Sequence, residues 1–334
     1  MNRKYWAVRW NWPLKARNGN GTDGNRHNDP NEDLPRSFTG DACPDFLCVG
    51  AQKAGTSWLY RQLEAHPDFW MPPLKELHYF DQLNRTKRFH PPRCGDERDE
   101  SFLQSMETLR AHFYLDLESY GRLFRHKGPL LSGDISPAYS TLNDEIIERV
   151  VNHFPGLKVI FLARDPVERA WSQLSMGVRL GMIRPFDVTD PDEVIRNLLN
   201  PGVLIRSHPT KIVARWKRYV TRENLRVYFF DDLKENAAEL RRSILGFLGG
   251  DPDKPRPGLK PQENDDPNRN KLPLTAKVRD RMARFFREEL KACAAELGGR
   301  AKTWPTRYGL SLLLLLWDFF DDSIDLFFWC DWIG

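Results

Sequence analysis

The sequence lacks a strong excess of charge of either sign, and its few cysteines show no regular spacing. Its 334 residues contain 50 Lys and Arg against 46 Asp and Glu, a formal net charge of +4. This basic excess is too small to indicate nucleic acid as a partner, so any anion site must be local. An odd number of cysteines without metal-ligand spacing fits a reduced compartment better than a disulfide framework; they are Cys43, Cys48, Cys94, Cys293 and Cys330.

The N-terminal region also lacks a long apolar run. Arginines, lysines and a proline interrupt residues 1–17, MNRKYWAVRWNWPLKAR, which argues against a signal peptide or a membrane anchor there. Residues 1–42 are rich in Asn and Gly and poor in branched aliphatic side chains, a composition typical of a mobile tail. We therefore expect a cytoplasmic protein without a membrane-spanning segment, folded from residue 43 to residue 305.

Short apolar runs alternate with amphipathic segments along this domain. We expect strands at 45–50, 130–136, 157–163 and 225–230, with helices following at 56–66, from about 143, at 166–181 and at 233–249. Such alternation is typical of a parallel sheet covered by helices on both faces. The sequence thus predicts an α/β domain of three layers, α/β/α, around a central parallel sheet. We also expect a polar, partly helical insertion at 81–127 and a packing helix at 282–297.

The turn after the first expected strand has the spacing of a phosphate-binding loop. Gly50 and Gly55 are followed by Thr56 and Ser57, as in G-x-x-x-x-G-K-S/T, but the usual lysine is replaced and a lysine appears earlier, as Lys53. Glycines, inward-pointing amides and a helix N-terminus still form a cradle for an anion. Because the lysine position of ATP and GTP hydrolysis is lost and no acidic magnesium partner is evident, a different anhydride is favoured.

A second element follows the third expected strand, in VIFLARDPVERAWSQ, where Arg164 precedes an Asp-Pro helix start and Ser172 lies eight residues later. Together the two elements resemble the sulfotransferase family that uses 3′-phosphoadenosine 5′-phosphosulfate (PAPS). The resemblance runs from about Asp45 to Trp304 and is closest to the branch of bacterial and glycosaminoglycan (heparan sulfate) sulfotransferases. It implies a P-loop-NTPase-like fold, PAPS as co-substrate, 3′-phosphoadenosine 5′-phosphate (PAP) as product and no required metal.

The resemblance also implies which residues bind the donor. The first element supplies the 5′-phosphate site, Arg164 and Ser172 supply the 3′-phosphate site, and a later basic loop covers the 3′-phosphate. That later loop is equally compatible with a solvated basic segment, and Thr56 and Ser57 with ordinary helix capping. The donor-site residues are Lys53, Ala54, Gly55, Thr56, Ser57, Trp58, Arg164, Ser172, Arg269 and Lys271.

For the chemistry, the resemblance assigns Glu76, in PPLKELHYFD, as the catalytic base, and Lys53 as the cation that neutralises the leaving oxygen. His78 is an alternative base, since its ordinary pKa near 6.5 suits neutral pH. The competing interpretations are a surface ion pair of Glu76 with Lys75 and a structural histidine. In GDISPAY, Asp134 and Ile135 stand where the glycosaminoglycan branch has Glu and Lys. The missing lysine argues against a heparan-like substrate.

The acceptor is expected to be a hydroxylated or aminated molecule, a saccharide or another small compound. The variable segments 81–127 and 182–210 are expected to set its identity. Two other functions stay open at this stage. One is a P-loop nucleotide kinase, and the other is a non-catalytic PAP-binding or scaffold protein.

The C-terminal segment, 306–334, falls outside the resemblance. Four of its acidic residues recur at helical spacing between strongly apolar side chains, which predicts an amphipathic helix with an acidic face. Acidic residues disfavour both a spanning helix and a helix on an anionic membrane. We expect this segment to dock on its own domain or to mediate self-association; its acidic stripe consists of Asp318, Asp321, Asp322 and Asp325.

Overall fold

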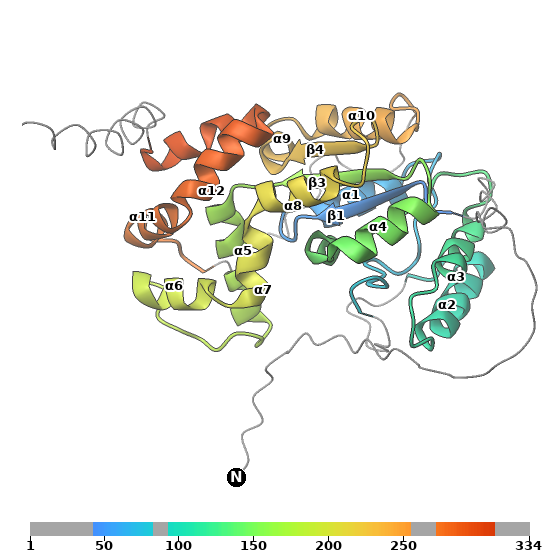
Figure 1. The fold of residues 1–334 in the computed structure, drawn as a ribbon, viewed down its shortest axis with the longest axis horizontal. Coiled ribbons are helices and arrows are strands. Elements are labelled where there is room, and N and C mark those ends of the chain that lie inside the picture. Colours follow the sequence, from blue (N-terminus) through green and yellow to red (C-terminus); the bar gives the residue numbers. More distant parts are fainter. Residues whose placement is uncertain (1–42, 83–92, 255–271, 311–334) are drawn as a thin grey trace, which may run out of the picture. The chain divides into compact units, whose positions relative to one another are not determined.

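The computed structural model describes residues 43–82, 93–254 and 272–310. The predicted tail 1–42, most of the C-terminal segment, and Arg269 and Lys271 lie outside these residues. The described strands are β1 (Phe46–Gly50), β2 (Gly133–Ile135), β3 (Lys158–Ala163) and β4 (Leu225–Phe229), paired in parallel in the order β2-β1-β3-β4 (Figure 1). The prediction of a central parallel sheet is confirmed. The strand predicted at 130–136 is shorter than expected.

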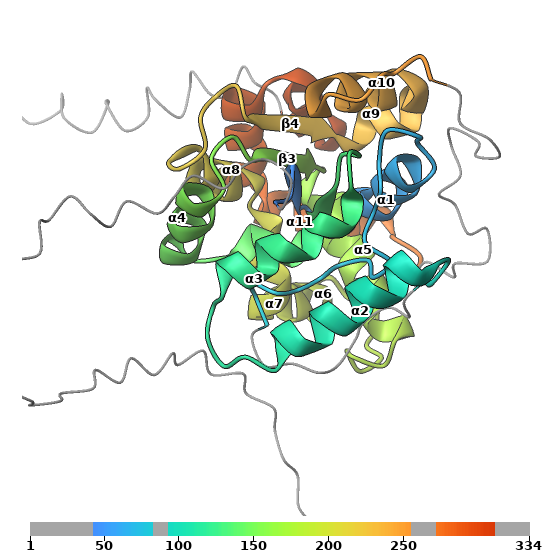
Figure 2. The same cartoon turned by 90° about the vertical axis from the view of Figure 1, so that its right-hand side faces the viewer.

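Helices cover both faces of this sheet, as the three-layer prediction requires. Figures 1 and 2 show α4 (Asp144–His153) and α8 (Pro209–Lys217) on one face, and α1 (Thr56–Glu64) and α10 (Ala237–Leu248) on the other. The two central strands, β1 and β3, are buried along almost their whole length, from Phe46 to Gly50 and from Val159 to Ala163. This explains their continuous apolar sequences, because a parallel sheet covered twice has no face for polar side chains.

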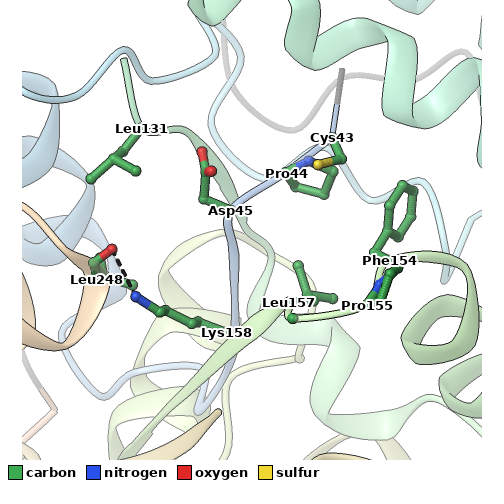
Figure 3. Close-up of a pocket in the computed structure, with 10 residues that line it drawn as sticks. Cys43, Pro44, Asp45, Leu131, Phe154, Pro155, Leu157, Lys158 and Leu248 are labelled. Atoms are coloured by element: carbon green, nitrogen blue, oxygen red, sulfur yellow. Dashed lines mark hydrogen bonds between the residues drawn. The ribbon is translucent and has the colours of Figure 1, made fainter. Parts of the chain in front are cut away.

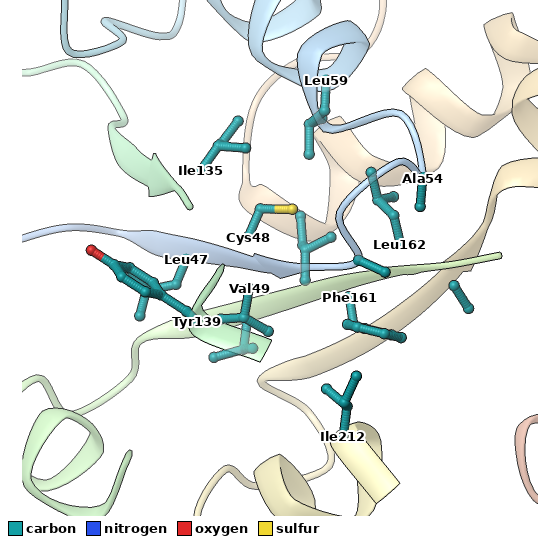
Figure 4. Packing of buried hydrophobic residues seen from close by; sticks show 14 of the residues in the cluster. Leu47, Cys48, Val49, Ala54, Leu59, Ile135, Tyr139, Phe161, Leu162 and Ile212 are labelled. Atoms are coloured by element: carbon teal, nitrogen blue, oxygen red, sulfur yellow. The ribbon is translucent and has the colours of Figure 1, made fainter. Parts of the chain in front are cut away.

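The core lies between the sheet and these helices. Figure 4 shows Leu47 and Val49 of β1, Phe161 of β3 and Ile212 of α8 among the packed side chains, and each of them is at most 2% exposed. Burial of such large apolar side chains stabilises the fold by roughly 1.5–3 kcal/mol each. The core thus fixes the positions of β1 and β3, which carry the two predicted phosphate-binding elements at their ends.

The remaining helices lie in the two variable segments, directly after β3 and β4, and toward the C-terminus. The predicted insertion contains α2 (Glu97–Arg110) and α3 (Leu117–Arg122). The predicted helix at 166–181 is α5 (Pro166–Arg179). The others are α6 (Pro191–Leu198), α7 (Pro201–Leu204), α9 (Phe230–Glu235), α11 (Ala276–Phe285) and α12 (Arg287–Ala292). No helix among the described residues combines the length and the apolar character needed to cross a membrane.

Two long helices predicted from sequence are each divided in the structure. The segment predicted at 233–249 forms α9 and α10, because Asn236 leaves the helical conformation and its side chain accepts a hydrogen bond from Glu239 N. Such an N-cap satisfies an otherwise unpaired amide at the start of α10. The segment predicted at 282–297 spans the end of α11, α12 and a final π-helical turn, with a break at Phe286.

Candidate functional site

The turn after β1 forms the expected cradle at the N-terminus of α1. Gly55 is the N-cap residue with φ of 96°, and no side chain caps the helix. Capping is therefore not the role of Thr56 and Ser57, which occupy the first helical turn. Lys53 also has a positive φ, 73°, so the chain reverses sharply and directs the helix N-terminus toward the carboxyl edge of the sheet.

The close packing of the cradle explains its second glycine. A Cβ atom at Gly55 would lie 2.8 Å from Leu233 Cδ2, nearer than packed carbon atoms approach. Ala54 and Trp58 are buried to within 1%. Their side chains therefore belong to the core, and only their backbone amides are available to an anion bound in this turn. Of the predicted loop residues, Lys53, Gly55 and Ser57 are partly exposed.

Arg164, directly after β3, contacts this turn. Its Nη1 atom donates a 2.6 Å hydrogen bond to the Lys53 carbonyl oxygen, and its guanidinium carbon lies 4.2 Å from the centre of the Phe230 ring. Lys53 Nζ in turn lies 3.6 Å from Met176 Sδ on α5. The two predicted elements therefore meet at one edge of the sheet, as expected for turns that follow neighbouring parallel strands. Ser172, also on α5, is partly exposed.

A network of ionisable side chains surrounds Arg164. Glu168 Oε2 accepts hydrogen bonds from Arg164 Nη2 at 3.2 Å and from Lys234 Nζ at 2.8 Å. Asp165 caps α5 through the amides of Val167 and Glu168 and also accepts a 2.8 Å hydrogen bond from the Tyr308 hydroxyl. Burial raises the pKa of Asp165 to about 6, although the hydrogen bond from Tyr308 opposes the rise.

Tyr308 belongs to a short C-terminal segment that packs on the residues beside Arg164. Trp304 Nε1 donates a 3.1 Å hydrogen bond to Asp231, and Arg307 also pairs with Asp231. None of these contacts was predicted, because they join residues 304–308 to residues at the starts of α5 and α9, which are far away in the sequence. The residues involved carry no motif that would single them out in the sequence.

The predicted catalytic segment forms a second cluster of charges. Glu76 lies between two cationic groups: Lys75 Nζ is 2.5 Å from its Oε1 atom, and His78 Nε2 is 3.2 Å from its Oε2 atom. The other imidazole nitrogen, His78 Nδ1, lies 3.0 Å from Asp81 Oδ2. Asp81 was not predicted as a site residue, and its position three residues after a histidine is the only sequence signal for it.

The protonation of His78 follows from its two carboxylate neighbours. Burial lowers the pKa of His78, but the hydrogen bonds to Asp81 and Glu76 outweigh it and raise this pKa to about 9. At neutral pH both ring nitrogens therefore carry protons and donate. His78 in this state is an acid rather than a base, and both its imidazolium and the Lys75 ammonium contact the Glu76 carboxyl group.

The segment after Glu76 packs against the carboxyl end of β2, the strand that pairs directly with β1. Leu77 N donates a 3.4 Å hydrogen bond to Asp134 on β2, and His78 N donates a 3.2 Å hydrogen bond to Ser136, directly after this strand. Within the residues that the structure describes, no group of three or more His, Cys, Asp and Glu side chains is arranged to hold a metal ion. The assembled groups can hold anions and move a proton.

A cavity of about 200 Å³ lies at the opposite edge of the sheet. Figure 3 shows Asp45 and Lys158 in its lining, with Lys158 Nζ donating to the Leu248 carbonyl oxygen at 3.1 Å. Asp45 precedes β1 and Lys158 begins β3, so this cavity is at the amino ends of the strands. It is therefore separate from the candidate site.

Known proteins share both the fold and the sequence pattern of this chain. A sulfotransferase of solved structure from Alicyclobacillus acidocaldarius superposes with a TM-score of 0.56 and 26% identity, over 79% of this chain and 99% of that chain. The membrane-associated sulfotransferase kil1 of Dictyostelium discoideum is 28% identical over 136 residues, which are 41% of this chain and 23% of that relative. The chain thus matches less than a quarter of the length of that relative. The family model described as Sulfotransferase family matches residues 44–253, more than half of the sequence, and the chain therefore belongs to the Sulfotransferase family.

Proposed function

We propose that this chain moves the sulfuryl group of PAPS to a hydroxyl or amine of an acceptor, a carbohydrate or another small molecule. The observation that carries the proposal is the hydrogen bond from Arg164 Nη1 to the Lys53 carbonyl oxygen. It joins the anion-binding turn after β1 to the arginine after β3. Two adjacent anion sites suit a nucleotide with phosphates at its 3′ and 5′ positions, and membership of the Sulfotransferase family supports that choice.

In this proposal each element takes one phosphate. The amides at the start of α1, with the hydroxyls of Thr56 and Ser57, bind the 5′-phosphate, which the positive end of the helix attracts. Arg164 and Ser172 bind the 3′-phosphate. Lys53 neutralises the oxygen that bridges sulfur and the 5′-phosphate, an interaction that strengthens as negative charge develops on that oxygen. No metal ion is required in this scheme.

Glu76 is the proposed base. During transfer the acceptor O–H bond breaks and an O–S bond forms, while the bond from sulfur to the bridging oxygen of PAPS breaks. The proton passes to the Glu76 carboxylate, and Lys53 compensates the charge on the leaving PAP. The geometry supports Glu76 over His78, because hydrogen bonds to Glu76 and Asp81 keep His78 protonated with a pKa of about 9.

The first test measures donor binding by isothermal titration calorimetry with PAP. Lys53→Ala and Arg164→Ala should each weaken binding roughly 10- to 100-fold, the loss of one charge-assisted hydrogen bond in each case. Lys158→Ala is the matched control, because this lysine lies at the opposite edge of the sheet. Unchanged PAP affinity in both site variants would refute the donor site.

The second test measures transfer of radiolabelled sulfate from PAPS to a panel of hydroxylated and aminated acceptors. Glu76→Gln should keep PAP affinity and lose turnover, since an amide cannot take the proton. PAP binding without transfer to any acceptor would support a non-catalytic binding or scaffold protein. Turnover of ATP with magnesium, independent of PAPS, would support a nucleotide kinase.

A further inference from the structure

Three consecutive backbone amides in the segment Glu76–Tyr79, called here the Glu76 segment, donate hydrogen bonds to side chains of one short motif. Leu77 N donates to Asp134 Oδ1 at 3.4 Å, His78 N donates to Ser136 Oγ at 3.2 Å, and Tyr79 N donates to the Tyr139 hydroxyl at 3.0 Å. Asp134 lies in β2, Ser136 directly follows this strand, and Tyr139 lies in the 3₁₀ helix Pro137–Thr141; each of the three is at most 1% exposed. The motif is the GDISPAY stretch, 133–139.

Asp134 links these acceptors into one unit. Its Oδ1 atom also accepts the Ser136 hydroxyl at 2.7 Å, and its Oδ2 atom accepts the hydroxyls of Tyr139 at 2.6 Å and Tyr120 at 3.2 Å. Four donors therefore occupy the hydrogen-bonding positions of one buried carboxylate. Because Ser136 and Tyr139 each donate to Asp134, their oxygen lone pairs are directed at the amides of the Glu76 segment.

The Glu76 segment needs such support because its backbone is in an unfavourable conformation. Glu76 and His78 have φ of 63° and 53°, in the left-handed region that side chains with a Cβ atom rarely adopt. Arg110 Nη2 adds a 2.7 Å hydrogen bond to the Leu77 carbonyl oxygen from α2. Residues persist in this conformation only where surrounding contacts fix it, and they cluster at functional sites.

We propose that Asp134, Ser136 and Tyr139 are positioning residues that hold the Glu76 carboxylate where it receives the proton of the acceptor. The proposal rests on the proposed function, in which Glu76 is the base. The three side chains touch neither donor nor acceptor in this scheme. They act through the backbone between Glu76 and Tyr79, and their effect should appear in turnover rather than in nucleotide binding.

The test compares two tyrosines on the same carboxylate. Tyr139→Phe removes a hydroxyl that bonds both Asp134 and Tyr79 N. Tyr120→Phe removes a hydroxyl that, within the described part of the chain, bonds Asp134 but none of the backbone amides from Glu76 to Tyr79. With PAPS and an active acceptor, Tyr139→Phe should lower kcat by about 100-fold, the effect of a displacement of about 1 Å in a catalytic group. Tyr120→Phe should keep kcat near that of the wild type.

The charge state of His78 supplies a readout that does not depend on activity. In the wild type its imidazole lies against Glu76 and Asp81, and its pKa is about 9; its charge also interacts with the buried Asp134, whose pKa it lowers against the effect of burial. If Tyr139→Phe releases the segment, the His78 pKa measured by NMR titration of the full chain should fall toward 6.5. In Tyr120→Phe it should stay near the wild-type value, while PAP affinity stays unchanged in both variants.

Ser136→Ala provides a smaller perturbation should Tyr139→Phe not fold. It removes the acceptor of His78 N and should also lower kcat with PAP affinity retained. The positioning role is overturned if Glu76→Gln is inactive while Tyr139→Phe and Ser136→Ala keep wild-type kcat and His78 pKa. That result would leave the proposed function intact. An active Glu76→Gln variant would instead refute the assignment of Glu76 as the base, and no transfer by the wild type would refute the proposed function.

Discussion

His78 should make the stability of this protein depend on pH between about 6.5 and 9. Its side chain is 10% exposed, so solvent screens its contacts with Glu76 and Asp81 only weakly. Since contact with these carboxylates outweighs burial and raises the pKa of His78 from 6.5 to about 9, the folded state binds the proton more tightly than the unfolded state. At 1.36 kcal/mol per pKa unit, this difference contributes about 3 kcal/mol to the free energy of unfolding.

The sign follows from linkage. The contribution is fully present below pH 6.5, where the unfolded state is also protonated, and is lost as pH rises through about 9. His78→Gln removes the titrating group. The difference in free energy of unfolding between the wild type and this variant should therefore be larger at pH 6 than at pH 10 by about 3 kcal/mol.

Urea denaturation followed by tryptophan fluorescence, repeated from pH 6 to pH 10, measures this difference. His126→Gln is the matched control. Burial lowers the pKa of His126, the direction opposite to that of His78, and loss of its ring contacts with Trp70 and Phe102 should change stability by a constant amount between pH 7 and pH 10. A difference for His78→Gln that is equally constant from pH 6 to pH 10 would refute the assignment of His78 as an imidazolium.

Two further predictions concern the turn at Gly55 and the hydrogen bond from Tyr308 to Asp165. Gly55→Ala should lower the free energy of unfolding by about 1–3 kcal/mol and weaken PAP binding, because φ is 96° and the new Cβ would lie 2.8 Å from Leu233. Thermal denaturation measures the loss of stability. The control is Gly246→Ala, which should not destabilise the protein because nothing lies within 4 Å of the new Cβ. Tyr308→Phe should lower stability by about 1 kcal/mol at pH 7. Because burial raises the pKa of Asp165 to about 6, the loss should shrink at pH 4.5, where Asp165 is protonated, and an equal loss at both pH values in urea denaturation would contradict this role.

The sequence predicted the frame of this fold well because local patterns encode it. Strands buried on both faces are continuous apolar runs, and the turns after β1 and β3 carry their own glycine, lysine and arginine signals. Since parallel neighbouring strands end at one edge, even the contact between the turn at Lys53 and Arg164 could be expected. Helix boundaries were less certain, as the division at Asn236 illustrates, because a capping side chain can end one helix and begin the next.

The parts that could not be predicted are contacts between distant segments. Tyr308 bonds Asp165 across 143 residues, and it lies just beyond the domain boundary predicted from the sequence. Asp81 lies at the start of the insertion, where composition indicates only polarity. The sequence shows Asp134 only as a departure from a family motif. Its four hydrogen-bond donors come from separate parts of the chain, and no local sequence pattern predicts that they meet at one carboxylate; they are Leu77, Tyr120, Ser136 and Tyr139.

The packing of Trp304, Arg307 and Tyr308 against the residues beside Arg164 has a consequence for biosynthesis. During translation the sheet and the turn at Gly55 emerge from the ribosome long before these three side chains. Until these residues are synthesised, Asp165 lacks its hydrogen bond from Tyr308, and Asp231 lacks its contacts with Trp304 and Arg307. The surroundings of Arg164, where the 3′-phosphate is proposed to bind, should therefore form late, and a nascent chain released before residue 304 should bind chaperones rather than nucleotide.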